Sequence, residues 1–147
     1  MDKFTRVYSL ALLVGGLAVM VSVFYEPPVV SGLNAQLKSN KTLAAYPYRF
    51  RVIDVTAGMA TITTPRTAEF PTSRALPLLY PELRSEGTDS AAFLEAQQEM
   101  ARVQGVARQL VTGHEDIEGV TWTLDTKWLR DNGINPDLVR TALSDTK

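Results

Sequence analysis

The sequence predicts an α+β protein in which a single N-terminal transmembrane helix precedes a small antiparallel sheet packed on one long amphipathic helix. Residues 7–25 are apolar and uncharged, residues 48–64 alternate like a hairpin, and residues 89–112 carry apolar side chains at helical spacing. We therefore divide the chain into a transmembrane anchor (1–26), a stalk with a short helix (27–46) and an extracytoplasmic α+β domain (47–147).

The apolar run at the N-terminus has the length of a membrane-crossing helix. Its nineteen residues would rise about 28 Å, close to the thickness of a bilayer's hydrocarbon core. The run is longer than the apolar part of a cleavable signal peptide, so we expect an uncleaved anchor. Lys3 and Arg6 precede it and Glu26 follows. This charge bias predicts a cytoplasmic N-terminus and a domain across the membrane. We expect the membrane to be the bacterial inner membrane, which makes the domain periplasmic.

A ridge of small side chains runs along one side of this predicted helix. Ala11, Gly15, Ala18 and Ser22 follow one another at helical spacing. Small side chains allow the backbone of a second helix to approach closely, as is common in membranes. We expect the ridge to pack against integral membrane protein subunits, although the pattern is equally compatible with self-association.

Composition limits the remaining functions. The 147-residue chain has 15 basic and 16 acidic residues, without a block of either sign, so we do not expect nucleic acid as a partner. It has no cysteine, which excludes disulfides and thiolate metal sites.

The segment after the anchor is predicted to contain one short helix. Pro27 and Pro28 stop the transmembrane helix and begin a stiff stalk. The pattern of residues 31–45 then predicts a helix whose inward positions are Leu33, Leu37 and Leu43.

Two strands should follow, at residues 48–56 and 59–64, with a turn at Ala57 and Gly58. Tyr48, Phe50 and Val52 would then share the buried face. Ile53 and Val55 interrupt the opposite, polar face. Either the sheet is covered on both sides near the turn, or a bulge shifts the register.

Residues 65–83, which we call the strap, contain four prolines and many apolar side chains. Such a run predicts an extended segment that lies along a surface. The strap can cover the protein's own core or dock a partner. The candidate docking residues are Phe70, Leu76, Leu78, Leu79 and Tyr80.

The C-terminal half is predicted to hold the long helix, a third strand and two short helices. The helix at 89–112 should end at Gly113, and residues 119–125 alternate like a strand. Asp125 and Asn135 are suited to cap the two short helices that follow.

His114 is the single histidine, and it lies beside Glu115, Asp116 and Glu118. Such a group can in principle hold a metal or move protons. An acidic turn after a helix is also commonplace, and the sequence has no nucleotide-binding or hydrolase motif. We therefore expect no catalytic residue, no metal and no cofactor.

Four arginines lie on the predicted hairpin and strap: Arg49, Arg51, Arg66 and Arg74. They are candidates to contact an anionic lipid headgroup or an acidic partner, because the short stalk keeps the domain near the membrane. Alternatively they solvate the surface or pair with Asp54 and Glu69.

These expectations favour a non-catalytic accessory subunit of a larger inner-membrane complex, with the lipid bilayer and integral membrane subunits as partners. A second hypothesis is a membrane-tethered periplasmic binding or assembly factor that acts transiently, which predicts an open apolar cleft in the domain. A third hypothesis is an enzyme centred on His114.

Overall fold

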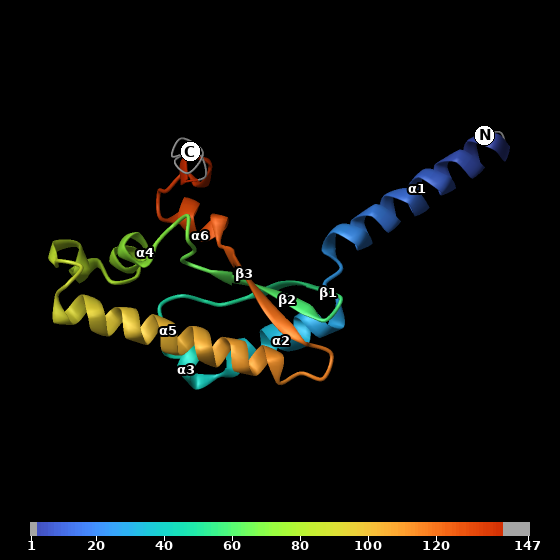
Figure 1. The fold of residues 1–147 in the computed structure, drawn as a ribbon. Coiled ribbons are helices and arrows are strands. Elements are labelled where there is room, and N and C mark those ends of the chain that lie inside the picture. Colours follow the sequence, from blue (N-terminus) through green and yellow to red (C-terminus); the bar gives the residue numbers. More distant parts are fainter. Residues whose placement is uncertain (1–2, 140–147) are drawn as a thin grey trace, which may run out of the picture.

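The computed structural model describes residues 3–139. It shows a long helix, α1 (Lys3–Phe24), projecting from an α+β domain (Figure 1). No residue of α1 is buried. The α+β class and the long apolar N-terminal helix are as the sequence predicts.

Three strands form one sheet in the order β1-β2-β3: β1 (Val52–Thr56), β2 (Met59–Thr64) and β3 (Gly119–Leu124). β1 and β2 pair antiparallel, whereas β3 runs parallel to β2. The prediction of an antiparallel sheet is therefore wrong, and the sheet is mixed. The reason is the long helix α5 (Ala91–Thr112), which carries the chain back along the sheet before β3 begins beside the start of β2.

The hairpin forms at the predicted turn. Ala57 and Gly58 have φ angles of 49° and 75°, the left-handed values that a twisted two-residue turn requires. The register shifts between Val52 and Asp54, which is the predicted bulge. Ile53 stays 49% exposed, so β1 is not covered on both faces.

β1 is shorter than the strand predicted at 48–56. Val52 pairs with Ile62, so residues 48–50 would need partners at and beyond the end of β2. There Pro65 follows β2 at once and has no N–H to donate. Tyr48 and Phe50 are nevertheless buried, as their alternation predicts.

The helix predicted at 31–45 is two helices, α2 (Pro28–Ser39) and α3 (Lys41–Ala45). The Asn40 side chain separates them, because its Oδ1 accepts a hydrogen bond from the backbone N–H of Leu43 at 3.1 Å. Leu33, Leu37 and Leu43 are buried in the same core as the sheet. The folded domain therefore begins at Pro28, and only residues 25–27 separate it from α1.

The strap is not extended. It contains α4 (Thr72–Leu79) and the 3-10 helix η1 (Pro81–Ser85). Pro71 precedes α4 and Pro81 begins η1, where a proline's missing N–H costs no helical hydrogen bond. Phe70 and Leu76 are buried in the core. The other candidate docking residues pack half-buried against that core: Leu78, Leu79 and Tyr80.

α5 and the last elements follow the predicted pattern. Ser90 caps α5 by accepting a hydrogen bond from Phe93 N–H, and one stripe of the helix is buried. Asp125 caps α6 (Thr126–Asp131), and Gly133 follows it with φ of 76°. Residues 136–139 are helical, and the rest of the predicted final helix lies outside the described residues. The buried stripe of α5 consists of Phe93, Met100, Val103, Ala107 and Val111.

Candidate functional site

A cleft of about 930 Å³ opens on the domain. Its walls come from α2, α3, the segment before β1 and α6. Its lining includes Glu26, two residues beyond the end of α1, and Asp131 of α6. The lining residues come from distant parts of the sequence, so the cleft exists only in the folded domain.

Aromatic side chains form one wall of the cleft. The Tyr48 ring meets Phe50 and Trp128 edge to face, at centroid distances of 5.0 and 5.7 Å. Only 2% of Tyr48 is exposed, and its hydroxyl donates to Asp125 Oδ2 at 2.9 Å. Burial raises the pKa of Tyr48 above its usual value. The hydroxyl is therefore a neutral hydrogen-bond donor at physiological pH.

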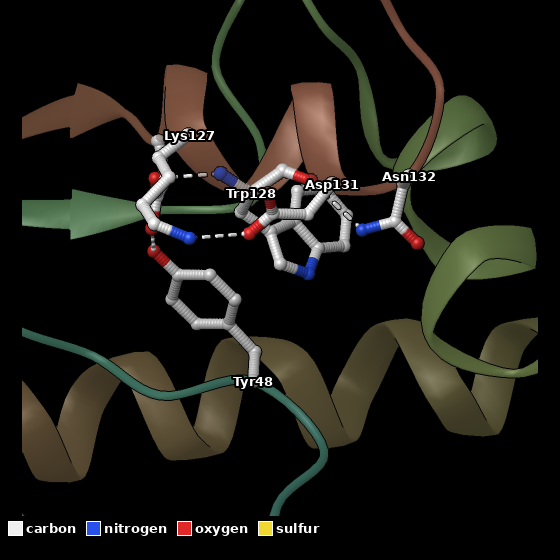
Figure 2. A network of polar contacts seen from close by, with 6 residues as sticks. Tyr48, Lys127, Trp128, Asp131 and Asn132 are labelled. Carbon is white, nitrogen blue, oxygen red and sulfur yellow. Dashed lines mark hydrogen bonds and ion pairs between the residues drawn. The ribbon is translucent and has the colours of Figure 1, made fainter.

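Asp125 hydrogen-bonds to both Tyr48 and α6, and Figure 2 shows Tyr48 beside Lys127, Trp128 and Asp131 of α6. Asp125 Oδ1 accepts from Trp128 N–H at 2.9 Å. Lys127 Nζ contacts Asp131 Oδ2 at 2.6 Å. Both carboxylate oxygens of Asp125 are thus bonded to protein groups. These contacts join α6 to the aromatic wall of the cleft.

Two of the four predicted anion-contacting arginines line the cleft. Arg49 and Arg51 are exposed there, with Lys38 of α2 as a third cation. Arg49 Nη1 donates to the backbone oxygen of Ala44 at 3.0 Å. Within residues 3–139, none of these three cations has a carboxylate within 4.0 Å. The expected partner Asp54 instead accepts a hydrogen bond from Thr56.

Arg66 and Arg74 lie elsewhere. Arg66 Nη2 donates to Gln104 Oε1 at 2.9 Å, and Gln104 in turn donates to Thr64 Oγ1. This chain of hydrogen bonds ties β2 to α5. The guanidinium of Arg74 lies 4.8 Å from the centre of the Phe70 ring. The four arginines therefore do not form one patch.

His114 sits in the turn between α5 and β3. Its Nδ1 accepts a hydrogen bond from Asp116 N–H at 3.2 Å and lies 3.7 Å from Asp116 Oδ2. In the part of the chain that the structure describes, no three potential metal ligands of the His, Asp or Glu type lie together. The contacts that the structure gives His114 stabilise the turn itself.

The small-residue ridge of α1 is fully accessible. Every residue of α1 is exposed, and beyond the neighbouring backbone of α1 itself nothing lies within 4 Å of the position that a Cβ would take at Gly15. The helix is long and apolar enough to cross a membrane, with a mean hydropathy of 2.3 in its most apolar window. These properties fit a single-pass anchor or a signal sequence. The ridge consists of Ala11, Gly15, Ala18 and Ser22.

No family model, curated protein or solved structure matches this chain. Any function must therefore be argued from the surface of α1 and from the cleft.

Sequence reasoning missed Lys38, Lys127 and the hydrogen bond between Tyr48 and Asp125. Tyr48 and Asp125 are 77 positions apart, and no local pattern links positions at such a separation. Asp125 was recognised in the sequence only as a helix cap, and nothing there indicated Tyr48 as its second partner.

Proposed function

We propose that this chain is a non-catalytic accessory subunit of a larger bacterial inner-membrane complex. α1 would cross the membrane and dock on integral membrane subunits, while the periplasmic domain stabilises them. One observation carries this proposal: none of the 22 residues of α1 is buried, although the helix is apolar. An apolar helix of this size needs a lipid or protein environment to cover it.

The charges at the two ends of α1 support the orientation. Lys3 and Arg6 belong to its N-terminal end, and Glu26 follows its C-terminal end. Positive charge favours the cytoplasmic side, so the domain that begins at Pro28 would lie in the periplasm. A reporter enzyme fused after Lys147 that is active only in the periplasm would support this topology.

Purification in a mild detergent tests the proposal. The tagged full chain should bring down integral membrane proteins in fixed stoichiometry. Gly15→Leu adds bulk to the ridge and should abolish this recovery by preventing close helix approach. Gly16→Leu adds the same bulk to another side of α1 and is the matched control. Recovery of the chain as a monomer, or equal recovery with both variants, would overturn the proposal.

The cleft favours a second candidate function, a membrane-tethered binding or assembly factor that acts transiently. Its volume of about 930 Å³ falls within the range of small-molecule sites. In that case membrane partners should be recovered only after chemical cross-linking. Stable recovery of membrane partners without cross-linking would favour the accessory subunit over the transient factor.

A further inference from the structure

We propose that the cleft binds the phosphate headgroup of an anionic phospholipid from the membrane that α1 crosses. The proposal rests on the proposed function in one respect, namely that α1 spans a membrane. The main observation is that Lys38, Arg49 and Arg51 line one cleft. Glu26, two residues beyond the C-terminal end of α1, lines the same cleft.

In the described part of the chain, none of these three cations is paired with a carboxylate, although Arg49 already donates one hydrogen bond to the backbone oxygen of Ala44. Four cations and three carboxylates line the cleft, but Lys127 pairs with Asp131 at 2.6 Å. Asp125 accepts hydrogen bonds from Tyr48 and from the backbone of Trp128. The last carboxylate, Glu26, accepts from Asn34 Nδ2 at 3.0 Å. An anion with several acceptor oxygens therefore fits the remaining donors.

The position of the cleft selects a membrane anion. Glu26 lines it and lies two residues beyond Phe24, the last residue of α1. An extended linker of residues 25–27 spans only about 10 Å. Asn34 bonds to both Glu26 and the backbone oxygen of Val52, which ties this linker to the cleft wall. The cleft is thus held at the level of the lipid headgroups.

The lining also suits an amphiphile better than a free ion. Guanidinium groups bind phosphate through paired hydrogen bonds, which Arg49 and Arg51 can supply. The lining also includes the apolar side chains of Ala44, Pro47 and Trp128. Such a surface can cover the glycerol backbone that a phospholipid carries next to its phosphate.

Native mass spectrometry of the full chain in maltoside micelles tests this inference. Phosphatidylglycerol is titrated as the anionic lipid, phosphatidylcholine as the neutral lipid and glycerol 3-phosphate as a soluble phosphate. We expect one saturable phosphatidylglycerol site with clear preference over the other two probes. Binding of glycerol 3-phosphate as tight as that of the lipid would overturn the membrane source, and equal binding of phosphatidylcholine would overturn recognition of the anion.

The double substitution Arg49→Gln with Arg51→Gln should weaken phosphatidylglycerol binding about 25-fold. This corresponds to about 2 kcal/mol, since a basic side chain at an anionic surface contributes about 1 kcal/mol and 1.4 kcal/mol is tenfold. Arg84→Gln with Arg108→Gln removes equal charge from exposed positions outside the cleft and should change binding less than twofold. Equal weakening by both pairs would refute the site.

Two further measurements keep the result interpretable. Circular dichroism verifies folding, and Lys38→Gln alone should weaken binding about fivefold if the double variant does not fold. Unchanged lipid binding by Lys38→Gln would then refute the site. Recovery of membrane partners is measured separately: cleft variants should retain them, whereas Gly15→Leu loses them. Failure of lipid binding with intact recovery would overturn only this inference.

Discussion

Asn34 offers a direct test of how α2 is joined to the sheet. Its Oδ1 accepts from Val52 N–H at 2.8 Å, and its Nδ2 donates to Val52 C=O at 2.9 Å. One side chain thus satisfies both backbone groups on the outer side of β1, where a further strand would otherwise pair. Asn34 thereby blocks the pairing of a further strand at Val52, the first residue of β1.

Asn34→Ala should lower the free energy of unfolding by about 2–3 kcal/mol. The two hydrogen bonds to Val52 contribute about 1 kcal/mol each. The N–H and C=O of Val52, left without a partner and poorly accessible to water, add a desolvation penalty. Val52 itself is only 1% exposed. For a domain of this size the midpoint of thermal unfolding should fall by about 10 °C.

Urea unfolding of the full chain in maltoside micelles, followed by circular dichroism, measures this loss. Hydrogen exchange at the Val52 amide reports the edge itself and should become much faster. Asn34→Asp retains the acceptor for Val52 N–H but turns a carboxylate oxygen toward Val52 C=O and the Glu26 carboxylate, so it should be at least as destabilising as Asn34→Ala. Gln36→Ala changes an exposed residue of the same helix and should cost less than about 0.5 kcal/mol. Asn34→Ala with parental stability and a protected Val52 amide would refute the reasoning.

Two other predictions concern the cleft wall. Burial raises the pKa of both Tyr46 and Tyr48, so their contribution to stability is complete below pH 10 and is lost as the pH rises further. Each should remove about 1.4 kcal/mol per pH unit above pH 10. Burial also raises the pKa of Tyr80, so Tyr48→Phe should remove one tyrosine's share of the slope in urea titrations from pH 9 to 11.5, and an unchanged slope would contradict this. Asp125→Ala removes the α6 cap and the acceptor for Tyr48, and should cost about 2 kcal/mol in urea unfolding. Asp131→Ala breaks only an exposed ion pair and should cost less than about 0.5 kcal/mol, so equal losses would contradict the role of Asp125.

Local patterns were enough to predict most elements. Helical spacing placed Leu33 and Leu37 of α2 in the core. Leu43 is buried as predicted, but it lies on α3, which Asn40 separates from α2. Asp125 capped the predicted helix because a carboxylate next to free backbone N–H groups satisfies them locally. The turn at Ala57 and Gly58 likewise depends only on neighbouring residues.

Strand direction could not be read in the same way. β3 pairs parallel to β2 because α5 crosses the sheet between them, and pairing across such a crossover leaves no local pattern. The prediction that the strap is extended was wrong for a different reason. Four prolines in a short stretch suggested extended backbone, but their effect depends on whether each lies before, at the start of or inside a helix. Pro71 and Pro81 occupy the tolerated positions.

The cleft depends on residues that only the complete topology brings together. Arg49 was recognised as a candidate because it alternates with buried neighbours, but Lys38 and Lys127 carry no signal until α2 and α6 are placed beside it. The division of the four arginines into two groups has the same origin. Arg66 follows β2 toward α5, whereas Arg49 and Arg51 precede β1 on the side of α2.

The connection between α1 and the domain links both proposals. A long stalk would let the domain move freely under its anchor, but the linker contains only residues 25–27 and α2 is part of the core. Asn34 then joins Glu26 to Val52, so the base of α1 and the edge of the sheet share one side chain. A partner helix that docks on the ridge of α1 would therefore also determine where the cleft lies relative to the membrane surface. The accessory role and the lipid site thus depend on the same short junction.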